Sequence, residues 1–333
     1  MAPHMQMSIA KRISSSSEDG TRRMEQIATE HQMTALENFH RLFPTEEDCI
    51  GFLFPLRWPQ GFVCPICRTQ HLHFTPRRYL ICPHCGNRSS LTTGTLMHGA
   101  KKPIRDWLLA IWWFSASSFD VSAKELQRLL DISCYETAWT WLQKLRLAMG
   151  RVNANRCRGV VEIGCGLVAP AYERKERALV LTAAEIVLAL GITGRIRMRH
   201  IVELDAKTLG FFLHEAVEES TTLLTGNEQL VSQLQATASG YYVAQSQPNL
   251  SSRMNELSRS FEACLNTVHR GGVTVKHLQL YLNEFCFRNN ASLLPDHWAV
   301  FKALITGVLG ESEKPYRQAR IVGEPALYNG RWS

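Results

Sequence analysis

The sequence predicts a mixed α/β protein with more than one domain, and three observations support this prediction. The chain has 333 residues, which is more than one hydrophobic core usually serves. Two pairs of closely spaced cysteines fall within residues 61–100. Beyond residue 150, strand-like segments are interleaved with segments of helical periodicity. With 45% apolar and 20% charged residues, the chain is also unlike disordered or low-complexity proteins.

Neither a membrane span nor a signal peptide is indicated. The longest apolar stretch, residues 178–192, is interrupted by Glu185 and is shorter than the roughly 20 residues that cross a bilayer. Residues 1–24 are polar and lack the apolar core of a signal peptide. We therefore expect a cytoplasmic protein without a membrane partner, with a flexible tail at residues 1–24 and a second tail at residues 311–333.

Residues 25–60 have apolar positions at helical spacing and predict a helical lead-in. Leu36, Phe39 and Leu42 fall on one helical face. The segment Pro44-Thr45-Glu46-Glu47 then reads as a helix start. Two short helices are therefore expected before the cysteine-containing segment.

The four paired cysteines predict a structural zinc site in a zinc ribbon at residues 61–100. Cys64-Pro-Ile-Cys67 and Cys82-Pro-His-Cys85 each place two thiolates on one tight turn, and four thiolates form a closed tetrahedral zinc shell. Iron in the same turns and unpaired structural cysteines are the alternatives. His71, His73 and His84 are spare donors that four cysteines make unnecessary. The spacer predicts a hairpin in which residues 71–74 pair with residues 79–81.

The zinc-ribbon segment is also strongly basic. The formal net charge of the chain is +7, and residues 61–105 contain no Asp or Glu. A solvated face is the ordinary interpretation of such a segment, but the absence of any counter-charge favours an anionic partner. We expect DNA contacts from Arg77, Arg78, Arg88, Lys101 and Lys102.

Residues 101–150 predict three helices arranged as a helix-turn-helix. Residues 103–114 carry an apolar face, and Ser122 with Glu125 and Ser133 with Glu136 form two capping boxes. The third helix would enter a DNA major groove, although such modules also serve as plain packing or dimer units. The exposed contacts expected from it are Thr137, Thr140, Lys144 and Arg146.

Residues 151–310 predict a mixed sheet with flanking helices. Strands are expected at residues 159–164, 178–186, 195–204, 221–225 and 241–245. Helices are expected at residues 206–217, between the last two strands, and at residues 251–266, 273–287 and 295–309. This order of elements is that of a ribonuclease-H-like α/β domain: three strands, a helix, a strand, a helix, a strand and then helices.

Six segments of the sequence resemble segments of a known family and occur in the same order as in that family. They are FPTEEDCI (43–50), LRWPQGFVCPICR (56–68), SLTTGTL (90–96), VVEIGC (160–165), GRIRMRHIV (194–202) and VKHLQLYLNEFCFRNN (275–290). The chain thereby resembles bacterial insertion-sequence transposases related to Merlin elements, which join a zinc ribbon and helix-turn-helix to an Asp-Asp-Glu/Asn nuclease domain. The resemblance implies binding of terminal inverted repeats, cleavage with two divalent metal ions and strand transfer.

The catalytic positions implied by the resemblance lack their carboxylates. Gly164 and Gly226 stand where the family has its two Asp residues, and Asn255 or Glu262 matches the third position. The family's Lys near that position and its Arg-Arg pair are also missing, the pair being replaced by Ala291-Ser292. Because two metal ions about 4 Å apart need anionic oxygens, the sequence predicts lost catalysis.

We therefore interpret the sequence as that of a transposase-like DNA-binding protein that recognises element ends. A homo-oligomer is possible. One alternative is an active transposase that uses Glu162 or Glu262 with Mg²⁺ or Mn²⁺. Another is a zinc-ribbon transcription regulator derived from a transposase. As an ordinary structural interpretation, Glu162, Glu185 and Glu284 are partly buried carboxylates satisfied by arginine or backbone.

Overall fold

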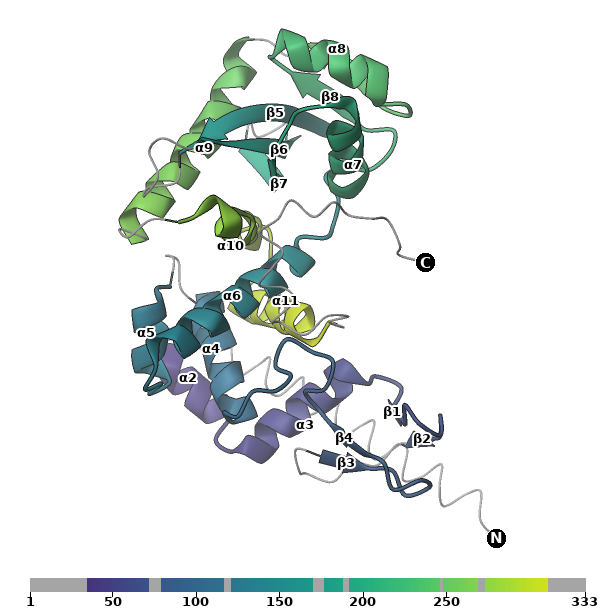
Figure 1. The fold of residues 1–333 in the computed structure, drawn as a ribbon, viewed down its shortest axis with the longest axis vertical. Coiled ribbons are helices and arrows are strands. Elements are labelled where there is room, and N and C mark those ends of the chain that lie inside the picture. The colour runs from purple at the N-terminus through teal and green to yellow at the C-terminus, as the bar shows by residue number, and fades with distance from the viewer. Residues whose placement is uncertain are drawn as a thin grey trace. The chain divides into compact units, whose positions relative to one another are not determined.

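The computed structural model describes residues 35–71, 79–116, 121–169, 177–187, 192–245, 248–268 and 273–310. These residues belong to two compact units (Figure 1). One unit contains the N-terminal helices, the ribbon strands and the last helix, α11 (His297–Leu309). The other contains helix α6 (Tyr135–Val152) and the large sheet with its helices. This division differs from the boundaries expected from the sequence, because α11 groups with the N-terminal helices and α6 with the sheet.

The first unit has an aromatic core between helices that are distant in the sequence. Helices α2 (Ala35–Leu42) and α3 (Glu46–Arg57) pack on α4 (Ile104–Ala116), as does α11. Thr45 and Asp48 form a capping box that starts α3. The ring of Phe52 stacks on that of Phe301 with centroids 5.9 Å apart, and Leu96 N–H donates to the Val308 carbonyl at 3.1 Å. The last helix therefore completes the core of the first unit.

Four short strands surround the cysteine turns. Strand β1 (Phe62–Val63) pairs antiparallel with β2 (Gln70–His71), and β3 (Tyr79–Ile81) pairs antiparallel with β4 (Arg88–Ser90). The expected pairing of residue 71 with residues 79–81 is wrong, because each cysteine turn closes its own hairpin. The backbone N–H of Arg68 donates to the Cys64 carbonyl at 2.9 Å, and that of Gly86 donates to the Cys82 carbonyl at 2.8 Å. Residues 72–74, also expected in that pairing, lie outside the described part of the chain.

The predicted helix-turn-helix is distributed over both units. Helix α5 (Ala123–Leu129) starts at the expected capping box, since Ser122 N–H donates to Glu125 at 2.8 Å and Glu125 N–H donates to Ser122 at 3.2 Å. The second expected box is wrong: α6 is capped by Cys134, which makes no side-chain capping bond. Helix α6 packs on α10 (Leu278–Ala291), whereas α4 packs on α2, α3 and α11.

A five-stranded mixed sheet organises the second unit, as the sequence predicts. Its strands follow the order β7-β6-β5-β8-β9, with β5, β6 and β7 antiparallel and with β8 and β9 parallel to β5. Their bounds are Val160–Val168, Ala178–Val187, Ile192–Ile201, Thr222–Thr225 and Tyr242–Gln245 for β5 to β9. The mixed α/β fold class is thereby confirmed.

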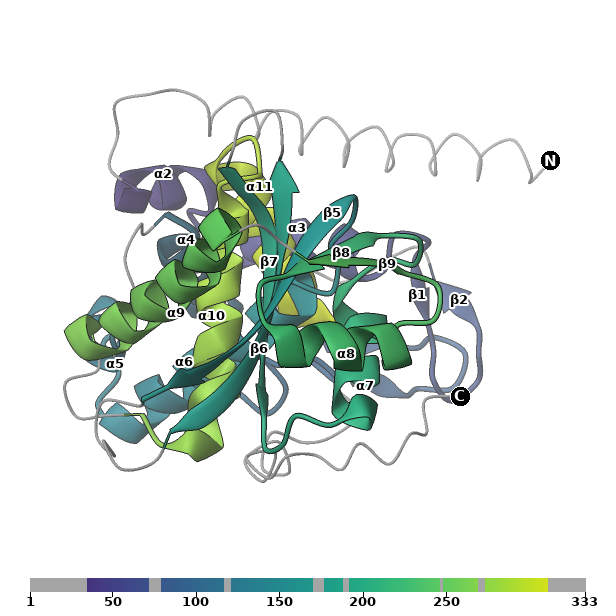
Figure 2. The same ribbon diagram turned by 90° about the horizontal axis from the view of Figure 1, so that it is seen from above.

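Helices cover both faces of this sheet (Figure 2). Helices α7 (Ala206–Ala216) and α8 (Glu228–Thr237) lie on one face, where Phe212 and Leu230 pack against Val161 and Ile163 of β5. Helices α9 (Pro248–Val268) and α10 lie on the other face, with a short 3-10 turn at Val275–His277 between them. Because side chains alternate along a strand, Glu162, Gly164 and Gly166 face the α9 side.

Within the part of the chain that the structure describes, no helix combines the length and apolar character needed to cross a bilayer.

Candidate metal centre and nucleic-acid interface

The four predicted cysteines meet in one cluster. Their sulfur atoms all lie within 4.8 Å of one another, with Cys64 Sγ 3.6 Å from Cys85 Sγ and Cys67 Sγ 3.5 Å from Cys82 Sγ. Tetrahedral zinc with Zn–S bonds of about 2.3 Å places its sulfurs about 3.8 Å apart. The cluster therefore fits a structural Zn²⁺ bound by Cys64, Cys67, Cys82 and Cys85.

The first cysteine turn also prepares its two thiols for metal binding. Hydrogen bonds with the side chain and the backbone of Thr69 lower the pKa of Cys67 to about 5. The pKa of Cys64 is likewise lowered, first by the backbone N–H of Cys67. Because thiolates are the form that binds zinc, this turn favours the ligating state.

One contact at the zinc centre could not be assigned from the sequence. The Nε2 atom of His71 lies 3.1 Å from Cys82 Sγ, so this histidine adjoins the cluster without replacing a ligand. His84 is exposed, and His73 lies outside the described residues. The tight spacing of the cysteine pairs gave no signal for this contact, which arises because β2 pairs with β1 beside the second turn.

The two glycines at the expected Asp positions each lie two residues beyond a paired position on neighbouring strands. Glu162 pairs with Leu224 across parallel strands β5 and β8, and continuing this register places Gly226 beside Gly164. Gly226 is exposed and directly precedes Asn227, the residue that caps α8. Carboxylates at these two positions would be neighbours, whereas two glycines supply no metal ligand.

Helix α9 runs closely along β5 in the same direction. A β-carbon at Gly164 would lie 2.7 Å from Met254 Cγ, and one at Gly166 would lie 3.1 Å from Ser258 Oγ. Farther along, Ala169 N–H donates to Glu262 at 3.0 Å. The residue of α9 that faces Gly164 is thus Met254. Of the two residues considered for the third catalytic position, Asn255 is exposed and Glu262 binds backbone beyond the end of β5.

Glu162 is the one carboxylate on β5, and it is buried. Its side chain is 1% exposed, and within the described residues neither carboxylate oxygen has a hydrogen-bond partner. Burial raises the pKa of Glu162 to about 7, against the opposing charge of Arg253. The expectation that arginine or backbone satisfies this carboxylate is therefore wrong, whereas it is confirmed for Glu185 and Glu284.

The carboxylates do not gather into a second metal site. Among the residues that the structure describes, the four cysteines are the only group of three or more His, Cys, Asp or Glu side chains whose ligand atoms lie close enough for one ion. A lone buried carboxylate such as Glu162 supplies too few oxygens for the divalent ions of phosphoryl transfer.

The basic residues expected at a DNA interface differ in exposure. Arg88 is exposed and lies over the Tyr79 ring, 3.8 Å from its centroid, and Lys101 is exposed. Lys102 donates to the Leu130 carbonyl at 3.3 Å and lies 3.9 Å from Asp106, so it is engaged within its own unit. Arg77 and Arg78 lie outside the described residues.

Two of the residues expected on the DNA-facing side of α6 are buried. Lys144 is 9% exposed and Arg146 is 1% exposed, so the expectation that these side chains are exposed contacts is wrong. Burial lowers the pKa of Lys144. Thr140 is partly exposed and Thr137 is exposed. Arg146 is buried because its side of α6 packs on α10.

Arg146 belongs to a buried charge network. Its Nε donates to Glu284 of α10 at 2.7 Å, and Arg288 donates to the same carboxylate at 2.8 Å. The Arg146 guanidinium also lies 3.9 Å from the centroid of the Tyr281 ring. Burial acts to raise the pKa of Glu284, but the two arginines outweigh it and hold the pKa below its ordinary value.

Comparison with known proteins places the zinc centre in a recognised domain type. Residues 44–88 match the transposase zinc-ribbon domain. This segment includes α3 and all four cysteines.

Relatives cover only part of the chain. Over 142 residues, 41% of this chain, the sequence is 26% identical to an uncharacterized protein in transposable element ISH50 of Halobacterium salinarum, of which it covers 47%. Among solved structures, a chain in the simian T-cell lymphotropic virus intasome complex with PP2A regulatory subunit B56 gamma matches with a TM-score of 0.27 and 10% identity, over 49% of this chain and 63% of that chain. The chain thus spans about half the length of its curated relative.

Proposed function

We propose that this protein is a transposase-related DNA-binding protein that recognises element ends and has lost DNA cleavage and strand transfer. DNA recognition is supported by the transposase zinc-ribbon match and by the relative encoded in a transposable element. The formal charge of +7 adds a favourable interaction with the phosphate backbone.

The observation that carries the loss of cleavage is the contact between Gly164 and Met254. Two-metal phosphoryl transfer needs carboxylates that bridge the ions. At Gly164 the space for such a side chain is occupied by Met254, a thioether that does not ligate Mg²⁺. At Gly226, two residues beyond the Glu162–Leu224 pair, there is no side chain.

Zinc supplies the stability of the ribbon in this proposal and takes no part in chemistry. Four thiolates fill the zinc coordination shell and leave no position for water or substrate. Arg88 and Lys101 offer exposed positive charge in the zinc-ribbon segment and the residues after it. The ribbon thereby serves recognition, with the phosphate backbone as the partner of its basic side chains.

The test separates binding from cleavage in one preparation. Purified protein is incubated with a duplex that ends in the inverted repeat of its own element and with a duplex of shuffled sequence, with Mg²⁺ or Mn²⁺. We expect a salt-sensitive mobility shift that favours the repeat, without nicks or joined products. End-specific products that disappear in Glu162→Gln would instead establish the alternative, an active enzyme with a substitute carboxylate. Failure to bind either duplex would refute DNA binding itself.

A further inference from the structure

A basic hollow lies at the start of β5, away from the two glycines. It is open to solvent, has a volume of about 380 Å³, and is lined by Ala154, Asn155, Arg156, Arg158, Arg195 and Glu218. Half of the lining residues are arginines and one is acidic. From Arg158 to Gly164 the strand rises by roughly 20 Å at about 3.3 Å per residue, so this hollow is separate from the expected catalytic position.

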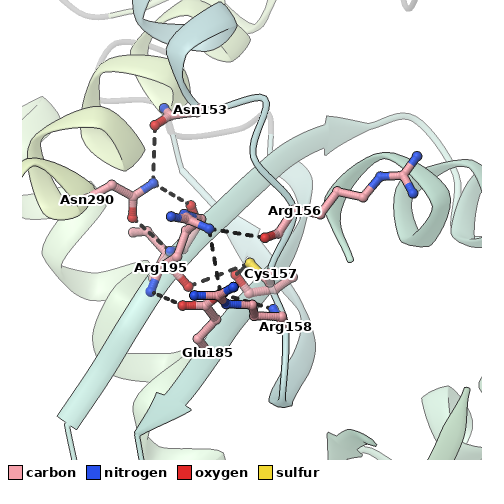
Figure 3. A network of polar contacts seen from close by, with 9 residues as sticks. Asn153, Arg156, Cys157, Arg158, Glu185, Arg195 and Asn290 are labelled. Carbon is pink, nitrogen blue, oxygen red and sulfur yellow. Dashed lines mark hydrogen bonds and ion pairs between the residues drawn. The ribbon is translucent and has the colours of Figure 1, made fainter. Parts of the chain in front are cut away.

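A single carboxylate fixes the backbone that carries two of these arginines (Figure 3). The two oxygens of Glu185 accept hydrogen bonds from Arg158 N–H and from Arg195 N–H, each at 3.0 Å. The Arg195 guanidinium in turn donates to the Arg156 carbonyl at 3.1 Å. These bonds hold three arginine-bearing positions in place before any ligand arrives.

The residue between Arg156 and Arg158 anchors the same segment from the other side. Cys157 is fully buried, its N–H donates to the Ala216 carbonyl at 2.7 Å, and its carbonyl accepts from Glu218 N–H at 2.8 Å. Because side chains alternate along an extended segment, burial of Cys157 directs both neighbouring arginines outward. Figure 3 shows the Arg156 side chain extending away from Glu185.

The charges in the hollow are not balanced. Glu185 lies 3.8 Å from the Arg195 guanidinium and already accepts two backbone N–H groups. Within the described residues, neither Arg156 nor Arg158 has an ion-pair partner. Two guanidinium groups on a fixed backbone therefore face solvent with Glu218 as the acid in the lining. Guanidinium matches the geometry of phosphate oxygens and binds them through paired N–H donors.

We propose that Arg156 and Arg158 bind phosphates of the DNA backbone at this hollow, with Arg195 holding the backbone of Arg156 and Glu185 holding that of Arg158. This inference rests on the proposed function, since it assumes that DNA is the polyanion. It assigns the sheet-containing unit a backbone contact of its own, in addition to those of the zinc-ribbon segment. The contact is with phosphate oxygens, so it adds affinity without reading sequence.

The test compares two variants that each remove two positive charges. Arg156→Ala/Arg158→Ala empties the hollow of its unpaired guanidiniums. Lys207→Ala/Arg259→Ala removes two exposed charges from α7 and α9 and is the matched control. Fluorescence anisotropy with labelled duplex is measured over a series of salt concentrations, and circular dichroism checks that both variants fold. We expect on the order of tenfold weaker binding for the first variant, with a salt slope reduced by about 0.9 for each lost phosphate contact. The control is expected to match the wild type.

A second arm uses inorganic phosphate to test the site independently of DNA. Arginine side-chain NMR signals of Arg156 and Arg158 are followed as phosphate is added to the wild-type protein. If the wild type fails to bind duplex but shows phosphate-induced shifts, the hollow is a phosphate-binding site, and both the proposed function and the DNA contact at the hollow are refuted. A wild-type salt slope in Arg156→Ala/Arg158→Ala, with intact DNA binding, would overturn the hollow as a DNA contact and leave the proposed function standing.

Discussion

Met254 occupies the space into which a side chain at Gly164 would extend: a β-carbon built on Gly164 would lie 2.7 Å from Met254 Cγ and 2.9 Å from its Sδ. Real side chains do not approach so closely, so a residue larger than glycine at position 164 requires α9 to shift or Met254 to repack. The glycine at position 164 and the bulky apolar residue that faces it are therefore mutually dependent. An Asp introduced at position 164 alone would therefore not be free to bind a metal ion, because Met254 occupies the space that its side chain needs.

The first prediction tests this dependence. We expect Gly164→Asp to destabilise the fold by about 1–3 kcal/mol, because it overpacks the contact with Met254 and buries a carboxylate. Adding Met254→Ala removes the overpacking and is expected to recover part of this loss. Urea unfolding of both single variants and of the double variant measures the coupling. Gly226→Asp, at an exposed position, is the control and should change stability little. A Gly164→Asp protein as stable as the wild type would contradict the packing argument.

The second prediction concerns the zinc centre. Cys64→Ser removes one of four ligands from a cluster whose metal binding is coupled to folding, with a typical binding free energy of about 10–16 kcal/mol. We expect the variant to lose its zinc and the hairpins β1–β2 and β3–β4 to unfold, while the sheet-containing unit keeps its structure. Metal analysis after gel filtration measures the loss of zinc, and amide hydrogen exchange at the ribbon residues measures the unfolding of the hairpins. Cys134→Ser, outside the cluster, is expected to retain zinc, and retention of zinc by Cys64→Ser would disprove the ligand assignment.

Local signals in the sequence were sufficient for much of this fold. The cysteine pairs, the Ser122–Glu125 capping box and the alternation along β5 involve residues a few positions apart, so their geometry is determined locally. The five strands, in their predicted order along the chain, and the four-cysteine centre followed from such signals.

Contacts between distant segments could not be predicted in the same way. Arg146 resembles a solvent-facing residue of a recognition helix until Glu284, 138 positions later, is placed against it. Likewise, the spacer between the cysteine pairs suits one central hairpin, but hydrogen bonding within each cysteine turn favours two separate ones. Met254 has no signature in the sequence, because its role depends on how α9 aligns with β5.

The third prediction follows from the buried Arg146–Glu284 pair. Removing Arg146 leaves the buried Glu284 carboxylate with Arg288 as its remaining charged partner, so Arg146→Met is expected to cost up to about 3 kcal/mol at neutral pH, the lower end of the cost of breaking a buried ion pair. Arg146→Met/Glu284→Met removes both members of this pair and leaves Arg288, whose side chain is 15% exposed, so it should recover part of this loss. Chemical unfolding reads both effects, with the exposed Arg259→Met as a control expected to change stability by less than about 0.5 kcal/mol. If the single and double variants are equally destabilised, packing rather than charge accounts for the loss.

The same pair predicts the response of the fold to acid. The pKa of Glu284 is held below its ordinary value of about 4.3 in the folded state. Its contribution to stability is therefore fully present above the ordinary pKa and is lost as the pH falls through the lowered folded value. Glu284→Gln should reduce this acid-dependent part of the unfolding free energy. An unchanged acid dependence in the variant would show that Glu284 is not ionised in the folded protein.

The last prediction concerns Glu162, whose pKa shifts in the opposite direction. Because burial raises the folded-state pKa to about 7, the folded protein binds more protons than the unfolded chain between the ordinary value of about 4.3 and pH 7. The contribution of Glu162 to stability therefore falls as the pH rises through this window and is constant above it. Glu162→Gln keeps the shape of the side chain without its charge, so we expect the variant to be about 1–3 kcal/mol more stable than the wild type at pH 8 and similar to it at pH 4. The exposed Glu228→Gln is the control and should follow the wild type at every pH. Equal stability of Glu162→Gln and the wild type at pH 8 would mean that the carboxylate is charged and satisfied in the folded protein, which is the condition that a substitute metal ligand requires.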